Sequence, residues 1–131
     1  MRTSQAAAAA LLTVLISACS QAAPTAIERV PITTERAPTN VCMEALITGV
    51  LVPHAQWGIA LQVPGTGELM QPIFPFGYSA ARDGVRLALL DETGRLVAHT
   101  GDLVQSSGGG IGGEGNPAVA LCDDTIEVVA G

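Results

Sequence analysis

Cys19 stands at the end of an apolar run, residues 6–16, from which it is separated by the small pair Ser17 and Ala18. A run of this length after a basic residue at position 2 fits an export signal and is too short to cross a bilayer as a helix. Small residues fit a peptidase cleft, and the thiol is a nucleophile for lipid attachment. We therefore expect residues 1–18 to be a lipoprotein signal peptide, and Cys19 to carry diacylglycerol and an N-acyl chain such as palmitate.

The other two cysteines, Cys42 and Cys122, are expected to form a disulfide. An odd number of cysteines in an exported chain needs an explanation, and lipidation of Cys19 leaves an even pair in an oxidising compartment. Closing a loop of about 80 residues stabilises a chain by about 4.5 kcal/mol in the chain-entropy model. Two buried free thiols or a metal pair are the alternatives, although two cysteines make a poor zinc site.

Residues suited to catalysis or metal binding are few and scattered. His54 and His99 lack the spacing of a metal motif, although together with Asp123 and Asp124 they could in principle bind a metal ion. The acidic pair at 91–92 and the pair at 123–124 both fall in predicted turns, where solvated carboxylates are ordinary. The chain has no Gly-x-Ser-x-Gly motif and no lysine. We therefore expect no enzyme activity, no metal site and no cofactor beyond the lipid.

The few aromatic side chains are candidates for a binding face. Phe74, Phe76 and Tyr78 are spaced by two, which places them on one face of a continuing strand, and Trp57 lies on a neighbouring predicted strand. Such a face in a barrel can stack bases or sugar rings. The alternative is that these side chains form the core, and Pro75 favours it by suggesting that the chain leaves the sheet there.

A glycine-rich segment, residues 106–117, is a candidate contact loop. It lacks the Gly-Lys-Ser/Thr ending of a phosphate-binding loop, and one copy does not make a calcium-binding glycine repeat. A flexible surface loop is the simpler interpretation, with contact to a ligand as the alternative. The candidate contact residues are Gly108, Gly109, Gly110, Gly112 and Gly113.

The charge of the chain excludes some partners. Residues 19–131 carry five arginines against twelve Asp and Glu, a formal charge of −7. An acidic domain repels phosphate backbones and anionic headgroups, so nucleic acid is not an expected partner. Contact with the membrane is expected through the acyl chains alone.

The elements expected to position these residues are strands. Residues 19–41 are rich in Ala, Pro and Thr and predict an extended tether of up to about 60 Å. Residues 42–131 predict one small all-β domain, an OB-like barrel or a β-sandwich, because short apolar strands alternate with turns. Residues 77–83 have room for one or two helical turns. The predicted strands are 45–52, 57–63, 68–74, 85–89, 95–100, 103–105 and 118–122, with 126–129 as an edge.

One arrangement of turns and strands resembles a known group. The segment 71–80 (QPIFPFGYSA) precedes the predicted hairpin, 94–104 (GRLVAHTGDLV) follows it, and the glycines at 108–110 lie downstream. This resembles small secreted bacterial proteins, many of them lipoproteins, with a compact OB-like barrel. The resemblance covers about residues 45–122 and implies a fold, but no catalytic residue. Some relatives are expected to have a cysteine near Trp57, which this chain lacks.

Together these features predict a lipid-anchored, non-enzymatic binding or interaction module of the bacterial cell envelope. It is expected outside the cytoplasm, on the periplasmic face or at the outer membrane of a Gram-negative cell, with an envelope protein or polysaccharide as partner. One alternative is a structural or stress-related envelope component with no specific small ligand. A small envelope hydrolase is the other.

Overall fold

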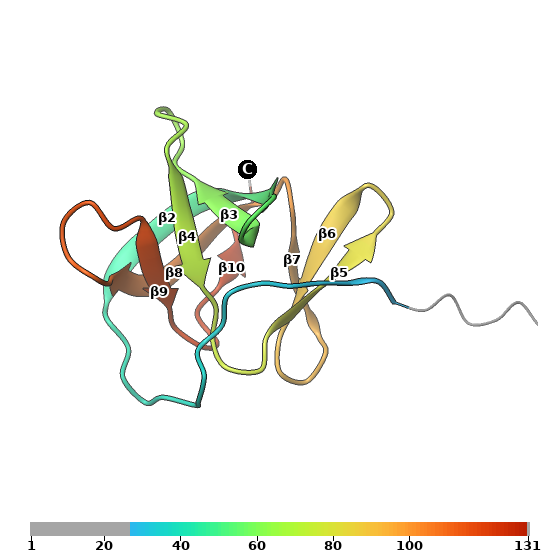
Figure 1. Cartoon of the computed structure of the whole chain (residues 1–131), viewed down its shortest axis with the longest axis horizontal. Coiled ribbons are helices and arrows are strands. Elements are labelled where there is room, and N and C mark those ends of the chain that lie inside the picture. Colours follow the sequence, from blue (N-terminus) through green and yellow to red (C-terminus); the bar gives the residue numbers. More distant parts are fainter. Residues whose placement is uncertain (1–26, 131) are drawn as a thin grey trace, which may run out of the picture.

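The computed structural model describes residues 27–130, and every regular element in this part of the chain is a strand. The predicted signal peptide and Cys19 lie outside the described residues. No helix within 27–130 is long and apolar enough to cross a membrane. The all-β prediction is confirmed (Figure 1). The strands are β1 (Arg29–Val30), β2 (Ala45–His54), β3 (Gly58–Gln62), β4 (Leu69–Ile73), β5 (Ser79–Asp83), β6 (Arg86–Leu90), β7 (Leu96–His99), β8 (Leu103–Gly110), β9 (Ala118–Leu121) and β10 (Glu127–Val128).

Five of these strands close into a barrel in the order β2-β3-β4-β9-β8 and back to β2. Closure depends on the length of β8, which pairs with β2 along one edge and with β10 and then β9 along the other. Strands β4 and β9 run parallel, whereas the other barrel pairs are antiparallel. This five-stranded closed barrel confirms the OB-like prediction over the sandwich, and closure leaves these strands without a free edge.

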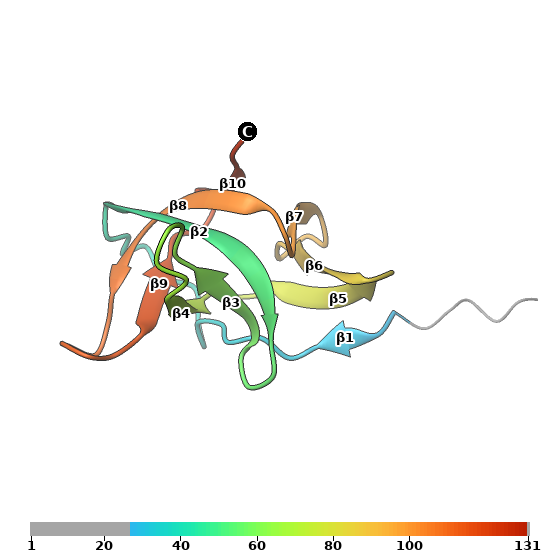
Figure 2. The ribbon, with the colours of Figure 1, turned by 90° about the horizontal axis from the view of Figure 1, so that it is seen from above.

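A second, smaller sheet has the strand order β1-β5-β6-β7; β5, β6 and β7 lie between β4 and β8 in the chain, whereas β1 precedes β2. Figure 2 shows it beside the barrel. The predicted hairpin is present as β6 and β7. A short helix was an option for residues 77–83, but residues 79–83 of this stretch form β5, which pairs in register with β6. The reason is tertiary: Ala80 and Ala81 are buried here, and their backbone groups bond to neighbouring strands on both sides.

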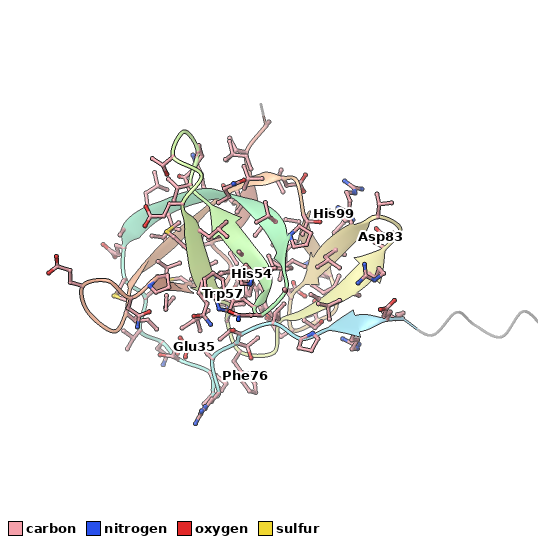
Figure 3. All side chains as sticks on the ribbon, turned by 45° about the horizontal axis from the view of Figure 1, so that its top comes forward. Glu35, His54, Trp57, Phe76, Asp83 and His99 are labelled. Atoms are coloured by element: carbon pink, nitrogen blue, oxygen red, sulfur yellow. A yellow bond between two sulfur atoms is a disulfide. The ribbon has the colours of Figure 1, made fainter. Side chains whose placement is uncertain are left out.

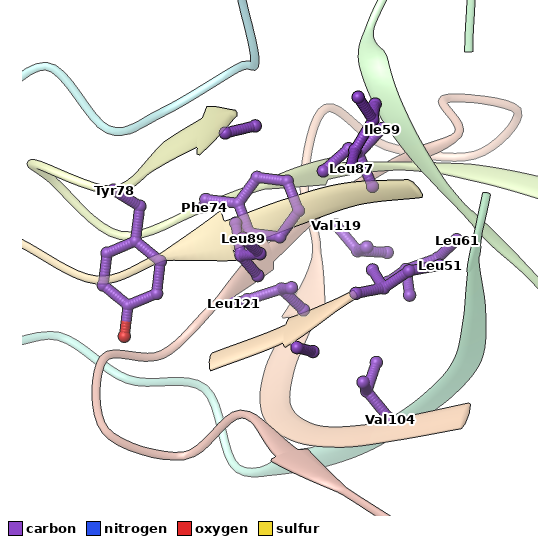
Figure 4. Packing of buried hydrophobic residues seen from close by; sticks show 12 residues of the cluster. Leu51, Ile59, Leu61, Phe74, Tyr78, Leu87, Leu89, Val104, Val119 and Leu121 are labelled. Atoms are coloured by element: carbon purple, nitrogen blue, oxygen red, sulfur yellow. The ribbon is translucent and has the colours of Figure 1, made fainter. Parts of the chain in front are cut away.

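One hydrophobic core lies where the barrel and the smaller sheet meet (Figure 4). Phe74 is fully buried at its centre, together with Leu51 and Ile59 from the barrel and Leu89 from the smaller sheet. Tyr78 lies at the margin of this cluster with 7% of its surface exposed. Burying a side chain of this size contributes roughly 1.5–3 kcal/mol, so these contacts hold the two sheets together.

Part of the predicted tether belongs to the folded domain. Residues 29–35, which we call the strap, are extended as predicted but are bound to both sheets. Strand β1 pairs with β5, the amide of Phe74 donates to the carbonyl of Thr33 at 2.9 Å, and the amide of Glu35 donates to the carbonyl of Phe74 at 2.9 Å. The side chain of Ile32 packs against the core. The boundary predicted at Cys42 is therefore corrected: the described fold already includes the strap.

The glycine-rich loop also begins later than predicted. Residues 106–110 continue β8, and the actual loop between β8 and β9 is 111–117. A Cβ at Gly108 would lie 2.2 Å from the carbonyl oxygen of Ala120, and one at Gly109 would lie 2.7 Å from Sδ of Met43. The glycines at these two positions therefore allow close approach of β9 and of the segment before β2.

Candidate functional site

A groove of about 860 Å³ lies at one end of the molecule, between the segment that precedes β2 and the β4–β5 connection. Figure 3 shows two of its residues, Glu35 and Phe76, at this end, well apart from the His99–Asp83 pair. Five separate stretches of the chain meet there. The lining residues are Glu35, Pro38, Thr39, Asn40, Val41, Cys42, Met43, Pro75, Phe76, Glu92, Ile111, Ala120, Leu121, Cys122, Asp123 and Thr125.

Apolar side chains dominate the lining, and several are open to solvent. Val41 is 80% exposed, Phe76 47% and Met43 40%. All three lie on connecting segments rather than on strands, so the barrel leaves them uncovered. An exposed apolar surface that is also concave is typical of a contact site for a ligand or partner.

The predicted disulfide is confirmed and lines the groove. Cys42 and Cys122 are bonded, with a Cα–Cα distance of 5.5 Å. The bond joins the segment before β2 to the end of β9. It therefore fixes one groove wall, which carries Val41 and Met43, against the barrel.

The ionisable side chains on the groove are acidic. Glu35, Glu92 and Asp123 line it, and none of its described lining residues is basic. Carboxylate oxygens of Glu92, Asp123 and Asp124 lie within 4.8 Å of one another, and all three residues are exposed. These carboxylates, which we call the rim of the groove, give this part of the surface a negative potential that favours a cation. A bound cation would also offset the repulsion between them.

Asp123 is held in place by the core. The Tyr78 hydroxyl donates to Oδ1 of Asp123 at 2.9 Å, and the amide of Asp124 donates to the same oxygen at 3.0 Å. Burial raises the pKa of Tyr78 well above its ordinary value, and the hydrogen bond to Asp123 raises it further. Tyr78 therefore stays protonated and donates throughout the physiological pH range.

Glu92 is positioned by the tight turn between β6 and β7. Oδ1 of Asp91 accepts hydrogen bonds from the Thr93 hydroxyl at 2.6 Å, the Thr93 amide at 2.9 Å and the Arg95 amide at 3.0 Å. The bond from the Thr93 hydroxyl lowers the pKa of Asp91 below its ordinary value. The turn therefore keeps its shape at neutral pH and presents Glu92 to the groove.

The structure separates the predicted aromatic face into three environments. Phe74 and Tyr78 are buried in the core, so the core interpretation holds for both. Phe76 lines the groove. Trp57 lies in the β2–β3 turn and stacks on His54 with 4.1 Å between ring centroids (Figure 3). The continuous stacking face is therefore corrected: the strand ends at Ile73, and the chain turns at Phe76 and Gly77.

The five glycines predicted as contact residues lie partly in a strand and partly in a loop. Gly108, Gly109 and Gly110 belong to β8, so they are not part of a loop. Gly112 and Gly113 lie in the β8–β9 loop with positive φ angles of 83° and 82°, a conformation that glycine adopts without steric cost. The groove is lined by Ile111, the first residue of this loop, and by none of the five glycines.

The histidines serve local structure. Nδ1 of His54 accepts hydrogen bonds from the amides of Gln56 and Trp57 at 3.2 and 3.0 Å. Nε2 of His99 lies 2.9 Å from Oδ2 of Asp83. Within residues 27–130, the one metal-type grouping of acidic, histidine and cysteine side chains is Glu92, Asp123 and Asp124, which neither histidine joins. Three carboxylates suit calcium or magnesium, although calcium takes 6–8 oxygen ligands and other groups would have to supply the rest.

Several groove residues lie in the segment that the sequence predicts as a tether, and were missed for that reason. Pro38 and Val41 show no strand periodicity, and Glu35 is one of several scattered charges; Met43 lies just after the predicted tether and before the first predicted strand. One signal was available: Val41 and Met43 flank Cys42, so a disulfide to Cys122 necessarily brings them to the end of the barrel.

Comparisons with known protein families, with curated proteins and with solved structures give no significant match for this chain.

Proposed function

We propose that the protein is a lipid-anchored, non-enzymatic binding module of the bacterial cell envelope, and that its groove is the binding surface. The sequence at Ser17, Ala18 and Cys19 supports the anchor and an address outside the cytoplasm. The groove, with its exposed apolar side chains held by a disulfide, is the observation that carries the binding role.

The groove chemistry favours binding over hydrolysis. Its lining offers carboxylates, hydroxyls and an amide, and both described histidines are occupied in other parts of the fold. These features support a surface that holds a partner without changing it.

The proposal is tested by photocrosslinking in intact cells that make the full chain. With p-benzoylphenylalanine in place of Phe76, irradiation should give a discrete crosslinked product. The matched control carries the same group in place of Val85, which is 98% exposed at the β5–β6 turn and does not line the groove. Products at 76 and none at 85 are the expected result.

The same cells test the anchor. Replacing Cys19 by serine should move the chain from the membrane to the soluble fraction and abolish incorporation of labelled palmitate. Equal crosslinking at positions 76 and 85, or none at either, would overturn the groove as a specific binding surface. That result would favour the structural or stress-related role.

A further inference from the structure

We propose that the groove binds a segment of a partner protein in which a basic side chain, arginine above all, is flanked by apolar residues. This inference rests on the proposed function and adds the chemistry of the occupant. It follows from the combination of an apolar lining with a rim whose ionisable groups are all carboxylates.

Charge complementarity selects the basic group. Glu92 and Asp123 on the groove, with the adjacent Asp124, place carboxylate oxygens within 4.8 Å of one another. A guanidinium can bridge two such carboxylates with paired hydrogen bonds, and in doing so relieves their mutual repulsion. Asp123 is already oriented for this contact because the Tyr78 hydroxyl and a backbone amide fix one of its oxygens.

Phe76 supplies a second contact for the same group. Glu92 lies against the backbone next to Phe76, since a Cβ on Gly77 would be 2.8 Å from Cβ of Glu92. Phe76 is the one aromatic side chain of the groove and remains 47% exposed. An arginine side chain can therefore stack on this ring while its guanidinium pairs with Glu92. Val41 and Met43 then receive the flanking apolar side chains.

The same charges exclude other occupants. A second copy of this chain has a formal net charge of −6, which opposes contact with an acidic rim. Anionic lipid headgroups and phosphate-bearing polymers are repelled for the same reason. Residues 1–26 contain one basic side chain, Arg2, which lies in the predicted signal peptide, so this segment offers no cation to the mature chain's groove. A basic partner segment satisfies both the apolar lining and the carboxylates.

The test uses the full chain, purified in a neutral detergent, and fluorescent nonapeptides with blocked ends whose apolar residues flank a central arginine. Peptides with citrulline in place of arginine keep the shape and lose the charge. We expect the citrulline peptides to bind about 10- to 100-fold more weakly, the range for losing a charge-assisted hydrogen bond. The variant with both Glu92→Gln and Asp123→Asn should lose the same factor for the arginine peptides.

The matched control is Glu68→Gln, which removes an exposed carboxylate from the β3–β4 loop outside the groove and should leave affinity unchanged. Far-UV circular dichroism and urea midpoints show whether the double variant remains folded. Equal binding of arginine and citrulline peptides, or no peptide binding at all, would overturn the inference. A calcium titration is the third part of the test. If calcium stabilises the wild type but not the double variant, and no peptide binds, the carboxylates form a metal site instead.

Failure of this inference is distinguishable from failure of the proposed function. If position 76 crosslinks in cells but the purified chain does not prefer arginine peptides, the groove is a binding surface whose partner is not recognised through a basic side chain. Absence of crosslinking at 76 would reject the groove itself.

Discussion

At the scale of single residues, Tyr78 links the core to the groove. Its ring lies at the margin of the core, and its hydroxyl orients Asp123 on the rim. It is also the chain's one tyrosine, and the chain has no lysine. With Cys42 and Cys122 bonded, Tyr78 is the principal side chain of the described domain that can titrate in strongly alkaline solution.

We predict that stability declines above about pH 10 and that Tyr78→Phe removes most of this decline. The pKa of Tyr78 is raised in the folded chain, so its stabilising contribution is complete below the unfolded value of about 10 and is lost as the pH rises toward the folded value. Urea midpoints read by Trp57 fluorescence across this range measure the effect. At neutral pH the variant should lose about 1 kcal/mol, the contribution of one hydrogen bond.

Tyrosinate absorbance provides the control for this prediction, because it reports Tyr78 alone. In urea, the unfolded chain should ionise near its ordinary value of about 10. The native chain should ionise at clearly higher pH, and coincident titrations would contradict the role assigned to the burial of Tyr78.

At the scale of elements, the strap decides how the two sheets are joined. It pairs with β5 through β1 and with the end of β4 through Thr34, which bridges Phe74 in parallel. The strap also passes over the start of β3, where the carbonyl of Pro31 approaches Gly58. This short segment is thus held by backbone hydrogen bonds, by Val30 and Ile32, which pack against the core, and by a hydrogen bond from the Gln71 side-chain amide to the Thr33 hydroxyl at 3.2 Å.

We predict that Gly58→Ala releases the strap and destabilises the fold by about 1–3 kcal/mol. The new Cβ would lie 2.0 Å from the Pro31 carbonyl oxygen, at a residue whose φ is +73°. Tryptic cleavage after Arg29, which is protected while β1 is paired, should become faster. Gly65→Ala is the matched control, because Gly65 has a similar φ of +87° with no atom within 4 Å of an added Cβ. Equal cleavage rates for the two variants would show that contact with the strap is unimportant.

At the scale of the whole molecule, the disulfide joins the two ends of the barrel sequence, since Cys42 precedes β2 and Cys122 follows β9. Figure 2 shows β1 toward one side of the molecule, beside β5, and the segment before β2 toward the opposite side. With Cys19 lipidated, as proposed, residues 20–28 are the spacer between lipid and strap. Nine residues reach about 30 Å at full extension, half of the span expected for a tether that ends at Cys42.

We predict that breaking this disulfide weakens both the fold and the groove. The double variant with Cys42→Ser and Cys122→Ser should lose up to about 4.5 kcal/mol of stability, because the unfolded chain gains the freedom of an open loop. Crosslinking at position 76 should fall too, since the wall that carries Val41 is no longer fixed. Urea midpoints of the oxidised wild type and the double variant measure the first effect. A reductant should lower the midpoint of the wild type and leave that of the double variant unchanged.

Several features of this protein are fixed by information that is local in the sequence. Alternating apolar residues between turns predicted an all-β chain, and the turn after β6 predicted the β6–β7 hairpin. Counting cysteines predicted the bond between Cys42 and Cys122, because the expected lipidation of Cys19 leaves these two as an even pair. Such inferences succeed because strand periodicity and tight turns depend on neighbouring residues, and the number of cysteines left to pair depends on composition.

Other features were decided only by the tertiary structure. The parallel pairing of β4 with β9 joins segments about 45 residues apart, and no local pattern specifies which strand edges meet. Gly108 is needed because β9 lies against it, and Phe74 is buried because the strap and the smaller sheet cover it. The groove likewise collects Glu35, Phe76, Glu92 and Asp123 from separate connections. Their common role depends on which segments the folded barrel brings together, whereas the sequence determined the kind of elements from which that barrel is built.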